Sequence, residues 1–490
     1  MSTPIRLNVN LSSGATVLWR KCSLKFNCAV YSARDDMVLE RKLADYIHQN
    51  QDRFVKDIVR LASLPSVSAR NEGIEECAEL VKKMIEEIGG SARLIRMDGV
   101  APLVYGEIKS SRSKKTILFY NHYDVQPEDP VELWKSSPFK PEIRGGRLYG
   151  RGVSDDKGEF VARLKMLESY IKVFGEPPCN VKFCLEGEEE VGSLHLDDYV
   201  GKNSELFRAD AVLWEYGHAD EADRPIVSLG VKGMVYVELA IKSLSQDAHS
   251  MYAAALPSSP WRMVRLLNMI KDESERILIP GWYDKVQDLT EDELKVLEQQ
   301  PFDANEFKRT FGAREFAGKM TDLQAKKALV SRPTANIAGV WGGYTGEGSK
   351  TVLPSTARCK IDFRLVPNQD PHELLEKLKK FLRDRGFADV EVISSTMEPA
   401  ARTSYRDPWA SAAIKAGEEV YGKKSVIELS SPGTGPLYVF TKRYGVPSLD
   451  IGVSPHDAAL HAPNENIRLD LFEKGMVWIA QTIENYLSSV

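Results

Sequence analysis

Seven side chains that could bind divalent cations or transfer protons stand out in this sequence, most of them at or just past the ends of apolar segments. Two are imidazoles and five are carboxylates. This donor set suits Zn²⁺, or Mn²⁺ and Co²⁺, better than soft metals or Ca²⁺. The residues are His122, Asp124, Asp155, Glu189, Glu190, Glu215 and His461.

The run Thr116–Asp124 is the segment around which the others are arranged. β-branched and aromatic residues fill it up to His122 and Asp124, so we predict a buried strand that ends at these two side chains. Two more apolar segments, Asn180–Leu185 and Ala209–Trp214, also end in acidic residues. Ligands collect beyond the carboxyl ends of strands in open α/β sheets, and we expect these side chains to meet there.

The set is large enough for two ions that share one carboxylate. Two divalent ions need about three protein ligands each and then lie about 3.5–4 Å apart around an activated water. We expect His122, Glu215 and a bridging Asp155 to hold one ion. Glu190, His461 and the same Asp155 would hold the other.

Two members of the set are expected to act without binding an ion. Glu189 is next to a ligand but would point elsewhere, which suits a general base acting on the water. Asp124 would hydrogen-bond the free ring nitrogen of His122 and fix its tautomer.

Each residue also has a simpler interpretation. An acidic run such as Glu188–Glu190 is usually a solvated face, and Asp155-Asp156 could be the N-cap of the helix that follows. His461 lies in a polar turn where a lone histidine is normally solvated, and Glu215 has His218 and Asp220 nearby as competing candidates.

The predicted elements place these residues in an α/β fold with a mostly parallel sheet and helices on its faces. Helices are expected at Val38–Leu64, Glu72–Ile88, Glu159–Phe174, Trp409–Tyr421 and Leu469–Leu487, and strands at Ala92–Met97, Leu103–Ile108, Ser425–Leu429 and Val446–Gly452, with a hairpin at Gly145–Gly152. After Arg224-Pro225 the pattern changes to strands followed by helices, which indicates an inserted α+β domain. Its expected elements are strands at Gly230–Lys242, Thr334–Val340, Ser355–Val366 and Asp389–Ile393, and helices at Trp261–Lys271, Glu291–Gln299 and His372–Arg385.

Composition excludes two classes of protein. The formal net charge of −5 over 490 residues argues against a nucleic-acid binder. No apolar run approaches 18 residues, so no membrane span is expected. The six cysteines are scattered without a paired spacing, which favours a reducing compartment such as the cytoplasm.

The first residues form a separate segment. Residues 1–34 hold no acid, five basic residues and several serines. This composition is typical of an organellar transit peptide and equally of a disordered leader. We assign residues 1–37 to a leader.

Four motifs resemble those of the di-metal exopeptidases and deacylases, a family that includes cytosolic non-specific dipeptidase, carnosinase, glutamate carboxypeptidase, succinyl-diaminopimelate desuccinylase, acetylornithine deacetylase and aminoacylase. The motifs are Phe119-Tyr-Asn-His-Tyr-Asp-Val-Gln-Pro127, Tyr149-Gly-Arg-Gly-Val-Ser-Asp-Asp-Lys-Gly158, Glu186-Gly-Glu-Glu-Glu190 and His461-Ala-Pro-Asn-Glu465. The resemblance covers about residues 38–490. It implies a catalytic domain, 38–230 with 399–490, that is interrupted by the insert, 231–398. It also implies that the insert is a lid that forms a homodimer interface, and that the Asp155–Asp156 peptide bond is cis.

The resemblance also implies further site residues. Asp247-Ala-His249-Ser looks like the lid motif whose histidine enters the partner subunit's site and stabilises the oxyanion. Thr351, Arg364 and Thr434 look like contacts to the substrate, with Arg364 on its carboxylate. The long lid favours the dipeptidase branch, whereas Glu215 is a departure because that branch usually has Asp there.

The expected function is metal-dependent hydrolysis of dipeptides or short peptides that carry a free C-terminal carboxylate. An N-acyl-amino-acid deacylase or a carboxypeptidase would use the same chemistry, and a metal-dependent scaffold without catalysis is an alternative from another class. The complete ligand set together with Glu189 speaks against the scaffold.

Overall fold

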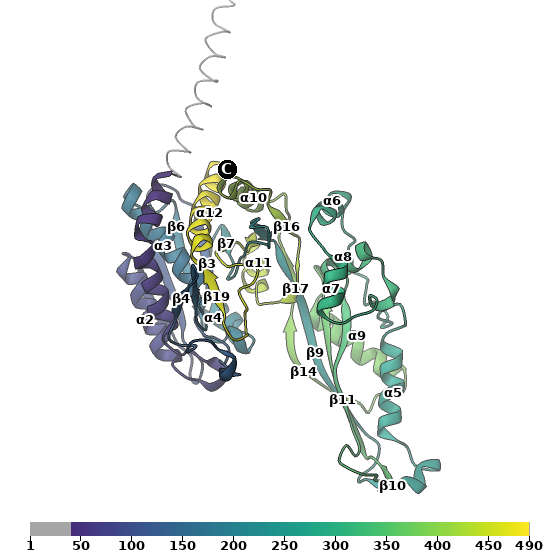
Figure 1. Cartoon of the computed structure of the whole chain (residues 1–490). Helices are drawn as coiled ribbons and strands as arrows, with labels where there is room; N and C mark the ends of the chain where they lie inside the picture. Colours follow the sequence, from purple (N-terminus) through teal and green to yellow (C-terminus); the bar gives the residue numbers. More distant parts are fainter. Residues whose placement is uncertain (1–40, 490) are drawn as a thin grey trace, which may run out of the picture.

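A six-stranded sheet carries the segments that the sequence analysis placed at the site (Figure 1). The computed structural model describes residues 41–489, so the predicted leader, residues 1–37, lies outside the described residues. The central strands β6, β3, β7 and β18 run parallel, and β1 and β2 form an antiparallel edge. The strands, in sheet order, are β1 (Ser91–Ile95), β2 (Leu103–Ile108), β6 (Asn180–Glu186), β3 (Thr116–His122), β7 (Ala211–Leu213) and β18 (Ser448–Leu449).

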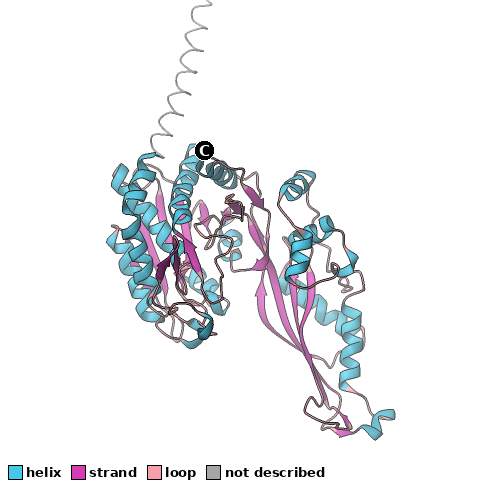
Figure 2. Ribbon diagram, in the orientation of Figure 1, coloured by secondary structure: helices cyan, strands magenta, loops and turns pink. Residues whose placement is uncertain are grey.

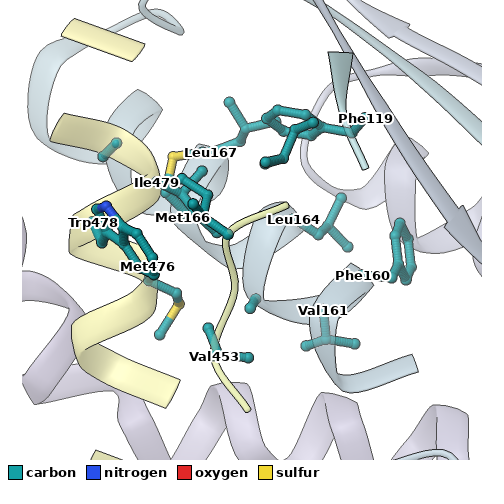
Figure 3. Close-up of a cluster of buried hydrophobic side chains, with 14 of the residues drawn as sticks. Phe119, Phe160, Val161, Leu164, Met166, Leu167, Val453, Met476, Trp478 and Ile479 are labelled. Carbon is teal, nitrogen blue, oxygen red and sulfur yellow. The ribbon is translucent and has the colours of Figure 1, made fainter. Parts of the chain in front are cut away.

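Helices on one face of this sheet bury a large hydrophobic core: the helix 41–62, α2 (Ile74–Glu87), α3 (Lys157–Phe174), α10 (Pro408–Tyr421) and α12 (Leu469–Ser488). The short helices α4 (Leu196–Lys202) and α11 (Tyr438–Tyr444) pack on the other face and bury a smaller core. Figure 3 shows Phe160 and Leu164 from α3 in the same cluster as Met476 and Trp478 from α12. Because α3 is enclosed on nearly all sides, its residues from Lys157 to Leu167 are buried, and the strand–helix turn before it is held firmly.

A second sheet, whose four long strands are antiparallel, spans the segment predicted as the insert and is visible as the long strands of Figure 2. Its order is β11 (Thr334–Trp341), β13 (Thr356–Leu365), β9 (Gly230–Lys242) and β14 (Glu391–Glu398). Alternate residues of β9, such as Val235 and Val237, form a core with α5 (Ser259–Ile270) and α9 (Pro371–Asp384). The alternate residues from Met234 to Ala240 are only half-buried, so the opposite face of this sheet is left open along that stretch.

The segment that carries α6 (Glu291–Gln299), α7 (Ala304–Thr310) and α8 (Asp322–Ser331) belongs to the insert in sequence but packs partly on the first core. Capping boxes at Thr290 and Thr321 begin α6 and α8. Leu289, Leu297 and Val330 from this segment are buried in the cluster that includes the six-stranded sheet.

The predicted α/β class with a mostly parallel sheet is confirmed. The predicted strand Ser425–Leu429 is present as β16 (Val426–Glu428), but it pairs with β8 (Ile226–Ser228) outside the main sheet. Several short elements were not predicted because they lack a readable period: α4 (Leu196–Lys202), α11 (Tyr438–Tyr444), β10 (Ala248–His249), β12 (Val352–Leu353), β15 (Ala401–Arg402), β17 (Ser431–Thr434) and β19 (Asn466–Arg468). The hairpin is β4 (Glu142–Arg144) with β5 (Arg147–Tyr149). Over residues 41–489, no helix combines the length and apolar character needed to cross a bilayer.

Candidate metal centre

The carboxylate of Asp155 lies between two imidazoles. Its Oδ1 is 3.0 Å from Nε2 of His122, and its Oδ2 is 3.0 Å from Nε2 of His461. The two histidines therefore face opposite oxygens of a single carboxylate, although they are far apart in the sequence. One carboxylate with an imidazole on each side is the arrangement expected of a bridging ligand.

A buried turn between β5 and α3 holds Asp155 in this position. The carboxylate of Glu465 accepts hydrogen bonds from the backbone amides of Gly152, Ser154 and Asp155, each at 3.0 Å, and from Arg151 at 2.8 Å. The Asp155–Asp156 peptide bond is cis, as the resemblance implied. Glu465 thus ties the segment that carries His461 to the turn that carries the shared carboxylate.

Asp124 fixes the turn that carries the two glutamates. Its Oδ1 accepts the backbone amide of Glu189 at 3.3 Å, and its Oδ2 accepts that of Glu190 at 3.1 Å. The Nδ1 atom of His122 is 3.1 Å from the Asp124 carbonyl oxygen and 3.4 Å from its carboxylate. The expected contact with the ring nitrogen is therefore made mainly by the main chain, and the Asp124 side chain has a second task that the sequence did not suggest.

Glu190 and Glu189 lie on either side of the shared carboxylate. The Oε2 atom of Glu190 is 3.1 Å from Nε2 of His461, and Gln126 donates its side-chain amide to the same oxygen at 2.8 Å. The Oε2 atom of Glu189 is 4.0 Å from Nε2 of His122. Ligand atoms of His122, Asp155 and Glu190 all lie within 4.8 Å of one another, close enough to surround a cation.

Glu215 offers a carboxylate oxygen without a partner, close enough to His122 and Asp155 for their charges to act on it. Its Oε2 is buried without a hydrogen-bond partner, while its carbonyl oxygen accepts Arg163 at 2.7 Å. Burial, followed by nearby carboxylates, raises the pKa of Glu215 well above its usual range, although His122 opposes this. A buried carboxylate oxygen without a hydrogen-bond partner is costly, so a cation at this position fits the residues present.

The other shifted pKa values in the cluster also come from burial and from neighbouring carboxylates. Burial acts to lower the pKa of His122, but hydrogen bonds with Asp124 and Asp155 outweigh it and raise that pKa well above 6.5. Hydrogen bonds with Asp155 and Glu190 raise the pKa of His461 to about 10. Burial, and then the Glu215 carboxylate, raise the pKa of Glu189 well above its usual range. Divalent cations bound here would neutralise the same carboxylates that cause these shifts.

The competing interpretations find less support in the structure. Asp156 precedes α3 but makes no side-chain cap; its Oδ2 instead accepts the backbone amide of His122 at 3.0 Å and the Asn121 side chain at 2.8 Å. Burial lowers the pKa of His218 to about 4, and Asp220 pairs with Arg224 at 2.6 Å. Asp156 and Glu465 are supporting residues that the sequence analysis did not single out, although both lie inside the quoted motifs.

The residues predicted to contact substrate form two separate pairs. Nη1 of Arg364 in β13 donates to Oγ1 of Thr434 in β17 at 2.6 Å, and both strands pair with β9. His249 in β10 lies 3.3 Å from Oγ1 of Thr351 through its Nε2. Figure 1 places β10 at the far tip of the second sheet, away from the six-stranded sheet. The structure therefore does not bring His249 and Thr351 to the metal cluster of the same chain.

Comparisons with known proteins agree with this geometry. A model of the peptidase family M20/M25/M40 matches residues 118–485. The Cys-Gly metallodipeptidase dug1 of Schizosaccharomyces pombe is 28% identical over 465 residues, covering 89% of this chain and 96% of that protein. The Beta-Ala-His dipeptidase of Homo sapiens is 28% identical over 381 residues, covering 73% of this chain and 75% of that protein. The structure of an M20 family metallo-carboxypeptidase, Sso-CP2 from Sulfolobus solfataricus, matches with a TM-score of 0.82 and 38% identity, covering 88% of this chain and 99% of that one.

Proposed function

Because the chain belongs to peptidase family M20/M25/M40, we propose that this metallopeptidase hydrolyses dipeptides or short peptides with a free C-terminal carboxylate. The observation that carries the proposal is the Asp155 carboxylate between His122 and His461, each 3.0 Å away. The names of the two dipeptidase relatives support the substrate class.

Two divalent ions fit the donor set, and Zn²⁺ suits its imidazoles and carboxylates best, with Mn²⁺ or Co²⁺ as alternatives. His122, Asp155 and Glu215 would hold one ion. Asp155, Glu190 and His461 would hold the other. When bound, such ions polarise a carbonyl and lower the pKa of water toward about 7.

Glu189 is the proposed general base. Its carboxylate lies 4.0 Å from His122 and makes no hydrogen bond within the described residues, so it is free to accept a proton from the attacking water. The same carboxyl then passes that proton to the leaving amine. Asp124 holds the Glu189 and Glu190 amides and so keeps the base beside the ligands.

Arg364 is the proposed partner of the substrate carboxylate. A guanidinium binds a carboxylate with two parallel hydrogen bonds, and Thr434 holds one arm of this guanidinium at 2.6 Å. Thr434 itself lies in the Pro432-Gly-Thr-Gly-Pro436 turn and would contact the substrate as well.

We further propose a homodimer formed through the lid, 231–398, in which His249 and Thr351 act in the partner's site. Their position at the tip of the second sheet supports this, because they have no role at their own metal cluster (Figure 1). The lid also exposes large apolar side chains on α5 and on the edge strand β11, which a second copy would cover. They are Trp261, Val264, Ile337, Val340 and Trp341.

The division into a catalytic domain, 38–230 with 399–490, and a lid, 231–398, is part of the proposal. The two large sheets support it, because each buries a hydrophobic core of its own, and only the α6–α8 segment of the lid packs partly on the first core. A cytoplasmic location is supported by Cys77, Cys179, Cys184 and Cys359, which are all free and buried.

A carboxypeptidase is the second candidate, and the match to Sso-CP2 at 38% identity favours it. A panel of substrates on the protein refilled with Zn²⁺, Mn²⁺ or Co²⁺ separates the possibilities. Our proposal predicts that Ala-Ala is cleaved with a higher kcat/KM than N-acetyl-alanine, N-succinyl-alanine or a blocked tetrapeptide. A clear preference for any of the blocked substrates would contradict it.

A further inference from the structure

Three side chains form a row across the open face of the lid sheet. Arg364 in β13 and Glu398 in β14 both pair with Met234 in β9, one on each side. Directly opposed residues of antiparallel strands point to the same face of a sheet. Val235, next in β9, is buried under the helices, so this row lies on the face that α5 and α9 leave open.

Glu398 is a carboxylate without a partner. Within residues 41–489 it makes no side-chain hydrogen bond, and no basic nitrogen lies within 4.0 Å of it. Burial raises the pKa of Glu398 to about 7, and Arg364 opposes this rise. Arg364 is already engaged by Thr434 at 2.6 Å and by Asp362 at 3.5 Å, so the two charges share a face without forming an ion pair.

Glu398 also lies toward the catalytic domain. Burial, and then the carboxylates of Asp197 and Glu398, raise the pKa of Tyr438 to about 12. Tyr438 begins α11, directly after the turn that carries Thr434. The unpaired carboxylate is therefore near the turn where the substrate is expected, and not at the tip of the lid.

The separation of Arg364 and Glu398 matches the length of one C-terminal amino-acid residue, from its α-carboxylate to the end of a long side chain. Neighbouring strands lie about 4.8 Å apart, so the backbones of Arg364 and Glu398 are separated by about 10 Å across β9. When the α-carboxylate of a substrate binds Arg364, the side chain of the C-terminal residue is the substrate side chain closest to Arg364. A lysine or arginine side chain extends about 6–7 Å from its Cα, which is enough to reach a carboxylate that leans toward it across Met234.

We propose that Glu398 recognises a cationic side chain on the C-terminal residue of the substrate, so that the enzyme prefers peptides ending in lysine or arginine. This rests on the proposed function, because it takes Arg364 as the site of the substrate carboxylate. Removing solvent from an unpaired carboxylate is unfavourable, and a cationic side chain would compensate for it where a neutral one would not.

The test compares Ala-Lys with Ala-norleucine, which has nearly the same side-chain length and no charge. The wild type should cleave Ala-Lys with a kcat/KM about tenfold or more above that for Ala-norleucine, because a charge-assisted hydrogen bond contributes about this much. Glu398→Gln should lower this ratio about tenfold. Glu398→Lys should reverse the charge preference, so that this variant cleaves Ala-Glu with a higher kcat/KM than Ala-Gln.

Glu238→Gln is the matched control. Glu238 lies on the same face of β9 and forms an ion pair with Arg358. Its substitution should therefore leave the ratio of kcat/KM for Ala-Lys to that for Ala-norleucine at the wild-type value. Thermal unfolding of each variant checks that it is folded.

Two results would overturn the proposal. One is a wild type that cleaves both dipeptides equally. The other is a Glu398→Gln variant in which both kcat/KM values fall together, which would mean that Glu398 only positions Arg364. Failure of the proposed function is distinct from both, because then neither dipeptide would be cleaved.

Discussion

Nε2 of His461 lies 3.0 Å from Oδ2 of Asp155 across a sequence separation of 306 residues. The contact joins the turn before α3 to the loop before α12, two helices that pack against each other in the first core. The hydrophobic core thus fixes the relative position of two ligands that neither segment could place alone.

Replacement of Glu189 by Gln should lower kcat for a dipeptide by about 10²–10⁴, because a general base contributes about this much. Metal content should be unchanged, since the Glu189 carboxylate is not an expected ligand. Steady-state kinetics and metal analysis of the same sample measure both. Glu188→Gln is the control, because Glu188 pairs with His195 at 2.6 Å and should retain most activity. A loss below about tenfold in Glu189→Gln would remove its assignment as the base.

Replacement of Asp124 by Asn should weaken metal binding or activity by about 10–100-fold, as is typical of residues that orient ligands. The carboxylate accepts two backbone amides, from Glu189 and Glu190, and one amide oxygen of Asn cannot accept both in the same way. Titration of metal-free protein with Zn²⁺, followed by activity, measures the effect. Wild-type affinity together with wild-type kcat would contradict the role given to Asp124.

A mixed dimer tests the assignment of His249. Chains carrying His249→Ala or Glu189→Gln should each be nearly inactive as homodimers, since loss of an oxyanion donor costs about 10²–10³ in kcat. A heterodimer purified through two different tags should recover about half of the wild-type activity, because one of its two sites is complete. If the heterodimer is as inactive as its parents, His249 does not act across the interface.

Stability should fall in acid partly because of His218. Its pKa is about 4 in the folded chain against 6.5 in the unfolded chain, since burial disfavours the charged ring. The unfolded chain therefore binds the proton first as the pH falls, and stability is lost from about pH 6.5 down to about pH 4. Chemical denaturation of wild type and His218→Gln across this range should show a smaller loss in the variant. Parallel curves for the two proteins would contradict this prediction.

Sequence patterns were sufficient to predict the fold class and the strands β3 and β6. The hydrophobic pattern of long apolar or alternating segments favours one type of secondary structure clearly. Sequence patterns also indicated that His122 and the Glu188–Glu190 run follow strand ends. They did not predict that Asp124 would bind two backbone amides, or that Glu465 would anchor the Asp155 turn. Both contacts depend on where loops distant in the sequence meet, and the hydrophobic periodicity of a single segment gives no information on that.

The insert shows the same limit. The alternation in Gly230–Lys242 predicts β9 correctly, but it does not show that Leu289, Leu297 and Val330 pack on the first core. Nor does it show that Glu398 pairs with Met234, because register between strands depends on turns and partners far along the chain.

The most direct test of the two-ion site is the number of ions bound per chain in wild type and in Asp155→Ala. Metal analysis of metal-loaded protein, after dialysis to remove unbound ions, should give two ions per chain for the wild type. The bound metal should also raise the temperature of thermal unfolding above that of the metal-free protein. Asp155→Ala should lose both ions, because each is expected to use that carboxylate. A wild type that binds one ion or none, or an Asp155→Ala variant that still binds two, would contradict the shared-carboxylate site.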